Sequence, residues 1–183
     1  REAAVDPGLV RIVIYPQMAF GTGHHPTTHL CLQVLAELRA EGRLGKGQLG
    51  LDLGTGSGIL GIAASLLGLQ TVGLDIDPVA VDNARLNRGL NPDGDRLDLL
   101  VGDVQCLQRR RRYDLILANI LAQPLMELAG EITSRLAPQG CLLLSGILRS
   151  QEQAVAQAYE KQGLGRPRAY QREDWSALLW QGG

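Results

Sequence analysis

The sequence is poor in aromatic residues and in net charge. Only 4% of its 183 residues are aromatic, phenylalanine occurs once, and the formal net charge is -1. Hydrophobic residues make up 45% of the chain, which is the balance of a globular domain and not of a disordered segment. Because there is no excess of positive charge, the composition does not indicate a dedicated nucleic-acid-binding protein. The length is typical of one domain.

Cysteine pairs and long apolar runs are also missing. The three cysteines, Cys31, Cys106 and Cys141, are far apart and form no C-x-x-C pair. This spacing argues against a zinc knuckle or a disulfide framework and suits reduced thiols, so we expect a cytoplasmic protein. No apolar run approaches the roughly 20 residues that span a bilayer, and no basic-then-apolar leader opens the chain. We therefore expect a soluble protein without a membrane partner.

Short apolar runs alternate with helical patterns, which predicts an α/β fold around a mostly parallel sheet. An extended lead, 10–15, precedes a first helix that Thr27 or Thr28 would cap. Asp77 and Pro78 have the pattern of an N-cap followed by N1, which predicts a helix start. The last apolar run would return as an edge hairpin. The expected strands are 49–53, 71–75, 96–103, 113–120, 140–147 and 175–181, the first five parallel, and the expected helices are 27–41, 58–68, 78–89, 124–136 and 150–162.

A glycine-rich turn, "DLGTGSG", follows the first expected strand of the sheet. Glycine at positions 54, 56 and 58 would let the backbone approach a ligand that side chains would block. Asp75 ends the neighbouring strand, where its carboxylate can accept hydrogen bonds from both ribose hydroxyls of an adenosine. These two features predict an adenosine-containing cofactor.

Two cofactors fit this pattern. Gly56, Gly58 and Gly61 satisfy G-x-G-x-x-G, so an NAD-dependent oxidoreductase is one reading. Asp52 lies inside the buried strand, where a charge without a partner is unfavourable, and a cationic ligand would relieve it. S-adenosylmethionine carries an ammonium and a sulfonium, which favours a methyl-donor site. A glycine loop that only packs strand against helix is the third reading.

The sequence resembles the class I S-adenosylmethionine-dependent methyltransferases in "DLGTGSGILGIAA", "GLDIDPVAVDNARLN" and "LANILAQPL". Its opening, "AFGTGHHPTTHLCL", is similar to one branch, the PrmA family, which methylates a large-subunit ribosomal protein. The resemblance implies a Rossmann-like, mostly parallel seven-stranded sheet of order 3-2-1-4-5-7-6. It also implies that residues 1–183 form a single catalytic domain, without the amino-terminal domain that captures the ribosomal protein.

The same resemblance implies cofactor contacts at Thr28, Gly54, Asp75 and Asn119. The "NILA" segment stands where amino-methylating relatives have "NPPY", so Asn119 would accept a hydrogen bond from a substrate amine and orient its lone pair. The segment lacks the proline pair and the aromatic residue of that box, so an aliphatic amine such as lysine fits better than a flipped nucleobase. A methyltransferase acting on RNA or on a small-molecule amine, and a catalytically idle cofactor-binding module, stay open. Asp103 would accept from the adenine amino group or lie solvated in its loop.

The remaining polar clusters point to no metal and no RNA partner. His25 and His29 are four residues apart, but no nearby carboxylate or thiolate completes a ligand set, so we expect no metal. His25 would support the turn before the helix or contact the ligand. The family has a different residue at His24, commonly threonine. The arginine run 109–112 is more typical of a solvated loop, so RNA contact is possible but not expected; a functional run would touch a ribosomal partner or RNA.

Overall fold

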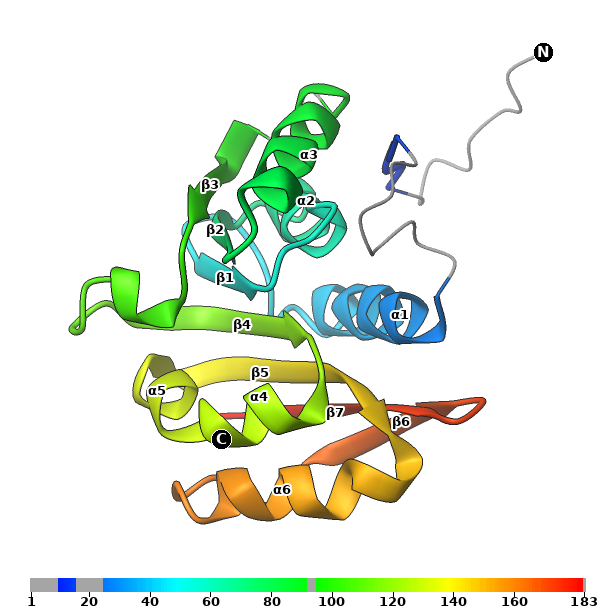
Figure 1. Cartoon of the computed structure of the whole chain (residues 1–183), viewed down its shortest axis with the longest axis vertical. Helices are drawn as coiled ribbons and strands as arrows, with labels where there is room; N and C mark the ends of the chain where they lie inside the picture. Colours follow the sequence, from blue (N-terminus) through cyan, green and yellow to red (C-terminus); the bar gives the residue numbers. More distant parts are fainter. Residues whose placement is uncertain (1–9, 16–24, 92–94, 183) are drawn as a thin grey trace.

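The computed structural model describes residues 10–15, 25–91 and 95–182. Within them, one seven-stranded sheet has the order β3-β2-β1-β4-β5-β7-β6, as the resemblance implied (Figure 1). The strands are β1 Leu49–Leu53, β2 Gln70–Asp75, β3 Leu97–Val101, β4 Tyr113–Asn119, β5 Leu136–Leu148, β6 Arg168–Arg172 and β7 Trp175–Gln181. The helices are α1 Pro26–Ala40, α2 Ile59–Leu66, α3 Pro78–Gly89, α4 Ala122–Glu127, α5 Ala129–Ser134 and α6 Glu152–Glu160.

The five strands expected to be parallel are parallel, and β7 pairs antiparallel with β5 and β6. The edge hairpin expected at the end of the chain is formed by β6 and β7: β6 is the edge strand, and 175–181 is the inner strand, β7, between β6 and β5. Its side chains from Ser176 to Trp180 are buried, whereas β6 is mostly exposed and polar. A strand covered on both faces needs a continuous apolar run, and a polar strand suits the edge.

Successive side chains of each strand point to opposite faces of the sheet, and helices cover both faces. On β4, Leu115 and Leu117 pack in the cluster of α1 and α2, whereas Ile116 and Ala118 pack in the cluster of α4, α5 and α6. Figure 1 shows α4, α5 and α6 grouped together, apart from α1, α2 and α3. None of the helices in the described ranges has both the length and the apolar character that crossing a membrane requires.

Two expected helix boundaries were wrong. His25, not Thr27 or Thr28, is the N-cap of α1, because Pro26 takes the first helical position and both threonines lie buried inside the helix. The expected helix 124–136 is two short helices that meet at Leu128, followed by β5 from Leu136. Gly130, a weak helix former, lies next to this break. The Asp77 cap of α3 is confirmed, with its carboxylate 2.9 Å from the Val79 amide.

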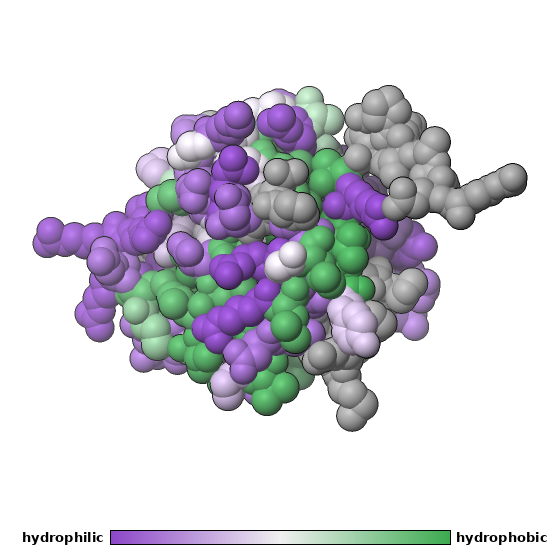
Figure 2. Space-filling view, turned by 90° about the horizontal axis from the view of Figure 1, so that it is seen from above, coloured by the Kyte–Doolittle hydropathy of each residue, from purple (hydrophilic) through white to green (hydrophobic). Residues whose placement is uncertain are grey.

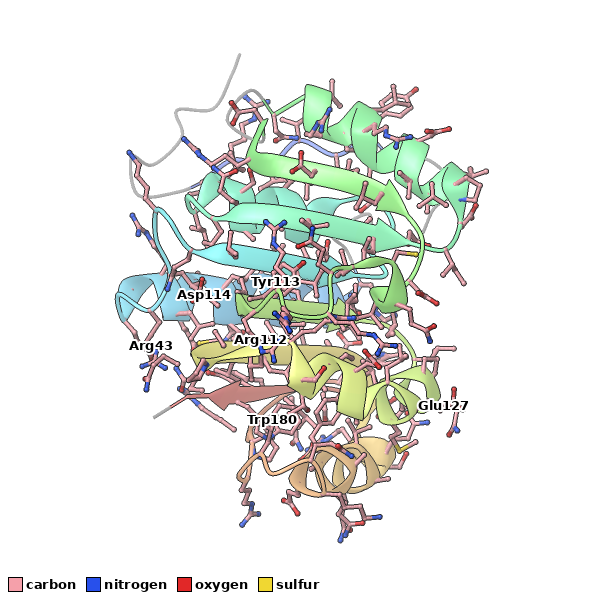
Figure 3. The ribbon with its side chains drawn as sticks, turned by 90° about the vertical axis from the view of Figure 1, so that its left-hand side faces the viewer. Arg43, Arg112, Tyr113, Asp114, Glu127 and Trp180 are labelled. Atoms are coloured by element: carbon pink, nitrogen blue, oxygen red, sulfur yellow. The ribbon has the colours of Figure 1, made fainter. Side chains whose placement is uncertain are left out.

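The amino ends of the parallel strands lie at the side of the molecule opposite the glycine turn. In Figure 3 the strands run across the view, and Tyr113 and Asp114 are labelled where β4 begins. The Asp114 carboxylate accepts a hydrogen bond from the Leu49 amide at 2.8 Å, which fixes the start of β1 beside β4. The Arg43 guanidinium donates to the Gly182 carbonyl at 2.7 Å and holds the end of the chain near the same side. These contacts leave the opposite, carboxyl ends of the strands for a ligand.

Candidate active site

The turn from β1 into α2 needs glycine for two reasons. Gly54 and Gly58 have φ values of 69° and 84°, in the left-handed region that favours glycine. A Cβ on Gly54 would collide with the Ile120 side chain, and one on Gly58 would lie 3.0 Å from the Cβ of Ala84 in α3. The glycines therefore serve the packing of the loop against β4 and α3 as well as the approach of backbone to a ligand.

Asp52 is paired within the protein. Its Oδ2 accepts hydrogen bonds from the Thr55 hydroxyl at 2.6 Å and from the Gly61 amide at 2.9 Å. Burial, with a smaller contribution from the neighbouring Asp75, raises the pKa of this carboxyl to about 6 against the lowering effect of the two hydrogen bonds. The expectation that Asp52 lacks a partner was therefore wrong. Its burial alone does not distinguish S-adenosylmethionine from NAD.

Asp75 shapes the loop that it faces. Its Oδ2 accepts from the Gly56 amide at 2.9 Å, and its Oδ1 accepts from the Asp77 amide at 3.1 Å. The carboxylate thereby links the end of β2 to the glycine turn of β1. A ribose hydroxyl would have to share these oxygens, which a carboxylate can do because it offers about four acceptor positions.

Asn119 carries an unpaired acceptor at the carboxyl end of β4. Its Nδ2 lies 3.5 Å from the Thr28 hydroxyl of α1, so the two predicted site residues are neighbours. Its Oδ1 is buried and has no hydrogen-bond partner among the described residues. A buried amide oxygen without a donor costs about 1–3 kcal/mol, and of the unpaired buried side-chain atoms in the described residues the Asn119 Oδ1 belongs to a residue that lines the cavity, where a ligand can supply the donor.

All the predicted site residues line one cavity of about 580 Å³. Its lining includes Thr28, Gly54, Gly56, Asp75, Asp103 and Asn119. They come from α1, from the glycine turn and from the ends of β2, β3 and β4, where the sheet order reverses next to β1. The structure thus places them around one space, while the role of each stays a prediction.

Sequence reasoning missed several lining residues that are apolar. Ile76, Val104, Leu121 and Trp175 line the cavity, and Ile76 and Leu121 are 77% and 70% exposed. Ile76 follows Asp75, and Leu121 lies two residues after Asn119, so their places next to predicted residues could have indicated them. Trp175 comes from β7, far away in sequence, and no local pattern points to it.

His25 serves the turn and also lines the cavity. Its Nδ1 lies 2.8 Å from the Thr27 hydroxyl and accepts from the Thr27 amide at 3.4 Å. Its ring meets the Trp175 ring edge to face, with centroids 4.9 Å apart. His24 lies outside the described residues. Across the part of the chain that is described, no three histidine, cysteine, aspartate or glutamate side chains are close enough to hold a metal ion.

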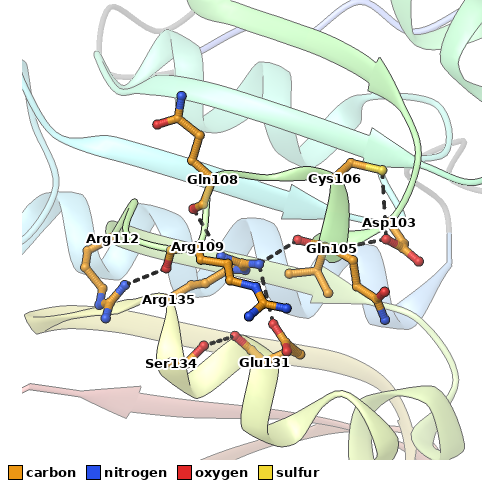
Figure 4. A network of polar contacts seen from close by, with 10 residues as sticks. Asp103, Gln105, Cys106, Gln108, Arg109, Arg112, Glu131, Ser134 and Arg135 are labelled. Atoms are coloured by element: carbon orange, nitrogen blue, oxygen red, sulfur yellow. Dashed lines mark hydrogen bonds and ion pairs between the residues drawn. The ribbon is translucent and has the colours of Figure 1, made fainter.

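The loop after β3 is anchored by a buried arginine (Figure 4). Asp103 caps the short 3-10 turn Val104–Cys106 by accepting from the Gln105 amide at 2.8 Å. Arg135 is 1% exposed and donates to the Val104 carbonyl at 2.9 Å and the Gln108 carbonyl at 3.2 Å. Arg135, the residue that ends α5, therefore fixes the cavity wall at Asp103 and Val104.

The arginine run 109–112 is exposed, as expected for a solvated loop. The loop protrudes from the molecule in Figure 1, and hydrophilic side chains project at the same end in Figure 2. Arg112 donates to the Arg109 carbonyl at 3.1 Å within the run. No ion pair found among the described residues involves the run.

Known proteins place the chain in a family. The sequence pattern of the family described as "Ribosomal protein L11 methyltransferase (PrmA)" matches residues 1–182. The chain belongs to this family. A ribosomal protein L11 methyltransferase of Syntrophotalea carbinolica is 45% identical over 183 residues, which cover 96% of this chain and 56% of the relative. One from Geobacter metallireducens is 42% identical, with 97% and 56% covered. The chain spans about half the length of these relatives.

A solved relative supports the assignment to the PrmA family. The crystal structure of a ribosomal protein L11 methylase from Lactobacillus delbrueckii subsp. bulgaricus has a TM-score of 0.75 and 30% identity, and the match covers 88% of this chain and 81% of that one. The fold is thus that of the class I methyltransferases, with the strand order implied by the resemblance.

Proposed function

We propose that the chain binds S-adenosylmethionine in this cavity and transfers methyl groups to amino groups of ribosomal protein L11. The acceptors would be lysine side chains, the amino-terminal amine, or both. The observation that carries the proposal is the buried, unpaired Oδ1 of Asn119 in the same cavity as the glycine turn and Asp75. Membership of the PrmA family supports the cofactor and the substrate. A ribosomal protein as substrate would place the chain in the cytoplasm.

The adenosine half of the cofactor has a matching set of side chains. Asp75 would accept from the ribose hydroxyls, and Ile76 and Val104 offer apolar surface for the adenine ring near it. Asp103 would accept from the adenine amino group beside the cap that it forms for the 3-10 turn. The same carboxylate oxygens that hold the protein loop would thus hold the ligand, which ties ligand binding to loop order.

The methionine half would lie against the glycine turn. Gly54 and Gly56 line the cavity there, and Thr28 approaches from α1. Asp52 lies beneath this turn and also lines the cavity, so an ammonium group above it would favour its charged form. Bound S-adenosylmethionine supplies the electrophilic methyl group; the residues of this chain orient the two reactants.

Asn119 would prepare the amine for attack. Methyl transfer needs nitrogen, methyl and sulfur nearly in line, so positioning supplies most of the catalysis. A lysine amine has a pKa near 10.4 and must lose a proton before it attacks. An Asn119 Oδ1 that accepts an N–H would hold the neutral amine with its lone pair toward the methyl group. The exposed Leu121 would cover the aliphatic stem and keep water from the nitrogen.

A labelling experiment tests this proposal. The chain is incubated with labelled methyl donor and with separated L11, RNA and metabolite fractions, and we expect label in L11 amines. Asn119→Ala should lower turnover by about 10² while cofactor affinity stays within a few fold, because the side chain orients the amine. Gln123→Ala, which changes an exposed residue nearby on α4, should behave like the parent. Label in RNA or metabolites alone, or no label with intact cofactor binding, would reject the proposed substrate.

A further inference from the structure

Two asparagines on α3 and just beyond it hold the segment 10–15, which we name the strap. The Val13 amide donates to Asn91 Oδ1 at 2.9 Å, and Asn91 Nδ2 donates back to the Val13 carbonyl at 2.8 Å. The Tyr15 amide donates to Asn87 Oδ1 at 2.8 Å. Asn87 and Asn91 are buried, whereas the strap is half-buried or exposed, so these contacts are partly buried. The strap is therefore fixed by side-chain amides and has no place in the sheet order.

The spacing of the contacts matches a strand lying on a helix. Asn87 lies in the last turn of α3 and Asn91 lies just past its C-cap, while residues 13 and 15 are about 6.6 Å apart along an extended chain. Residues 87 and 91 can therefore meet residues 15 and 13 in turn. Ile12 and Ile14, the alternate residues, pack against two apolar clusters of the core. The strap is thus held by hydrogen bonds from the backbone of Val13 and Tyr15 and by apolar contacts of the two isoleucine side chains.

Asn87 also reaches the glycine turn. Its Nδ2 donates to the Ser57 carbonyl at 2.8 Å, in the stretch between Gly56 and Gly58. Ser57 lines the cavity. One planar amide therefore holds the strap with its oxygen and the cavity loop with its nitrogen. Displacing either partner leaves a buried polar atom unpaired, which is unfavourable.

We propose that Asn87 is a positioning residue that couples the docking of the strap to the binding of the cofactor. The coupling rests on the proposed function, since it takes the ligand of the loop to be S-adenosylmethionine. When the strap is docked, its hydrogen bond to Asn87 Oδ1 orients the amide group so that Nδ2 can donate to the Ser57 carbonyl. When the loop is ordered, the hydrogen bond to Ser57 orients the same group so that Oδ1 can accept from the Tyr15 amide. Because coupling between two sites is reciprocal, ligand binding and strap docking should strengthen each other by the same factor.

The test uses hydrogen exchange and calorimetry on the whole chain. Exchange of the Val13 and Tyr15 amides is followed by NMR with and without S-adenosylhomocysteine, whose affinity is measured separately. The main variant is Asn91→Ala, because Asn91 contacts the strap but is not among the residues that line the cavity. Asn87→Ala removes both contacts, and Asp82→Asn, an exposed change on α3, is the matched control.

In the parent, the ligand should slow exchange at Val13 and Tyr15 by about tenfold. Asn91→Ala should speed that exchange about tenfold and weaken the ligand about three- to tenfold, and Asn87→Ala should weaken it further. Amides of β1 and β4 report whether each variant keeps its fold. An Asn91→Ala chain with a faster-exchanging strap and unchanged ligand affinity overturns the coupling, as does a variant whose strap exchange is unchanged. A parent that does not bind S-adenosylhomocysteine would instead reject the proposed function and this inference with it.

Discussion

Asp75 holds the glycine turn and would also hold the ribose. Replacing Asp75 should therefore weaken cofactor binding more than replacing an exposed carboxylate outside the cavity does. Replacing Asp75 by Ala deletes charge-assisted hydrogen bonds of roughly 1.5–3 kcal/mol each. We expect the affinity for S-adenosylhomocysteine to fall about tenfold or more in calorimetry. Asp77→Ala is the matched control, since it removes the α3 cap and lies outside the cavity lining. Unchanged binding in Asp75→Ala, or NAD binding by the parent, would contradict the assignment.

Asp52 makes stability depend on pH in an unusual direction. Its pKa is raised to about 6 in the folded chain, mainly by burial, so the folded state keeps the proton over a range in which the unfolded state has lost it. The contribution of Asp52 to stability is therefore present at low pH and is lost as pH rises from about 4 to about 6. The loss is about 3 kcal/mol at full effect.

Asp52→Asn should remove this dependence. Urea unfolding of the parent and the variant between pH 4 and pH 7 measures the difference between their free energies of unfolding. We expect that difference to shift by up to about 3 kcal/mol in favour of the variant as pH rises. A difference that stays constant across this range would show that Asp52 does not titrate there.

The sequence placed Asp75 and Asn119 correctly at strand ends and Asp52 inside the first strand, because the apolar runs of these strands end at fixed points. It could not find the Thr55 and Gly61 partners of Asp52, since a pattern of residue types does not show which donor turns toward a buried carboxylate. Trp175 was missed for a related reason. It reaches the cavity only because β7 is inserted beside β5, which is a property of the sheet order.

At the scale of elements, α5 supports the cavity through Arg135. Arg135→Met keeps most of the buried volume but removes the donors to the Val104 and Gln108 carbonyls. We expect the free energy of unfolding to fall by about 1–3 kcal/mol in urea titrations, because one buried and one partly buried acceptor lose their donor. Arg112→Met, an exposed change in the neighbouring loop, should stay within about 0.5 kcal/mol of the parent. Equal effects from the two variants would refute the anchoring role.

Periodicity predicted most elements because their boundaries carry strong local signals. Pro78 after Asp77 begins α3, and the glycine turn ends β1. The region 124–136 was predicted as one helix because its apolar spacing continues through Leu128. The backbone leaves the helical conformation at Leu128, and helical spacing alone does not distinguish two short consecutive helices from one longer helix.

At the scale of the whole molecule, the strand order came from resemblance and not from spacing. Alternating strands and helices predict a parallel sheet, but many orders satisfy that pattern. Inside the sheet β7 pairs with both β5 and β6 and also contacts the loop before β6, and these partners are far apart in sequence. The Trp180 indole, for example, donates to the Gly165 carbonyl at 2.7 Å, before β6 begins.

The last prediction concerns substrate capture. We propose that the 183 residues act as a catalytic unit and that a separate recognition domain, of the kind the family resemblance implies, raises the local concentration of L11. A tethered domain provides an effective concentration in the millimolar range for short flexible linkers and leaves the cavity unaltered. A fusion of this chain to the additional segment of a longer relative should therefore bind S-adenosylhomocysteine with the same affinity. Its kcat/KM on L11 should be at least about tenfold higher, with the gain in KM. Steady-state kinetics of both proteins on the same L11 preparation measures this, and equal kcat/KM values would show that these 183 residues carry their own recognition of the substrate.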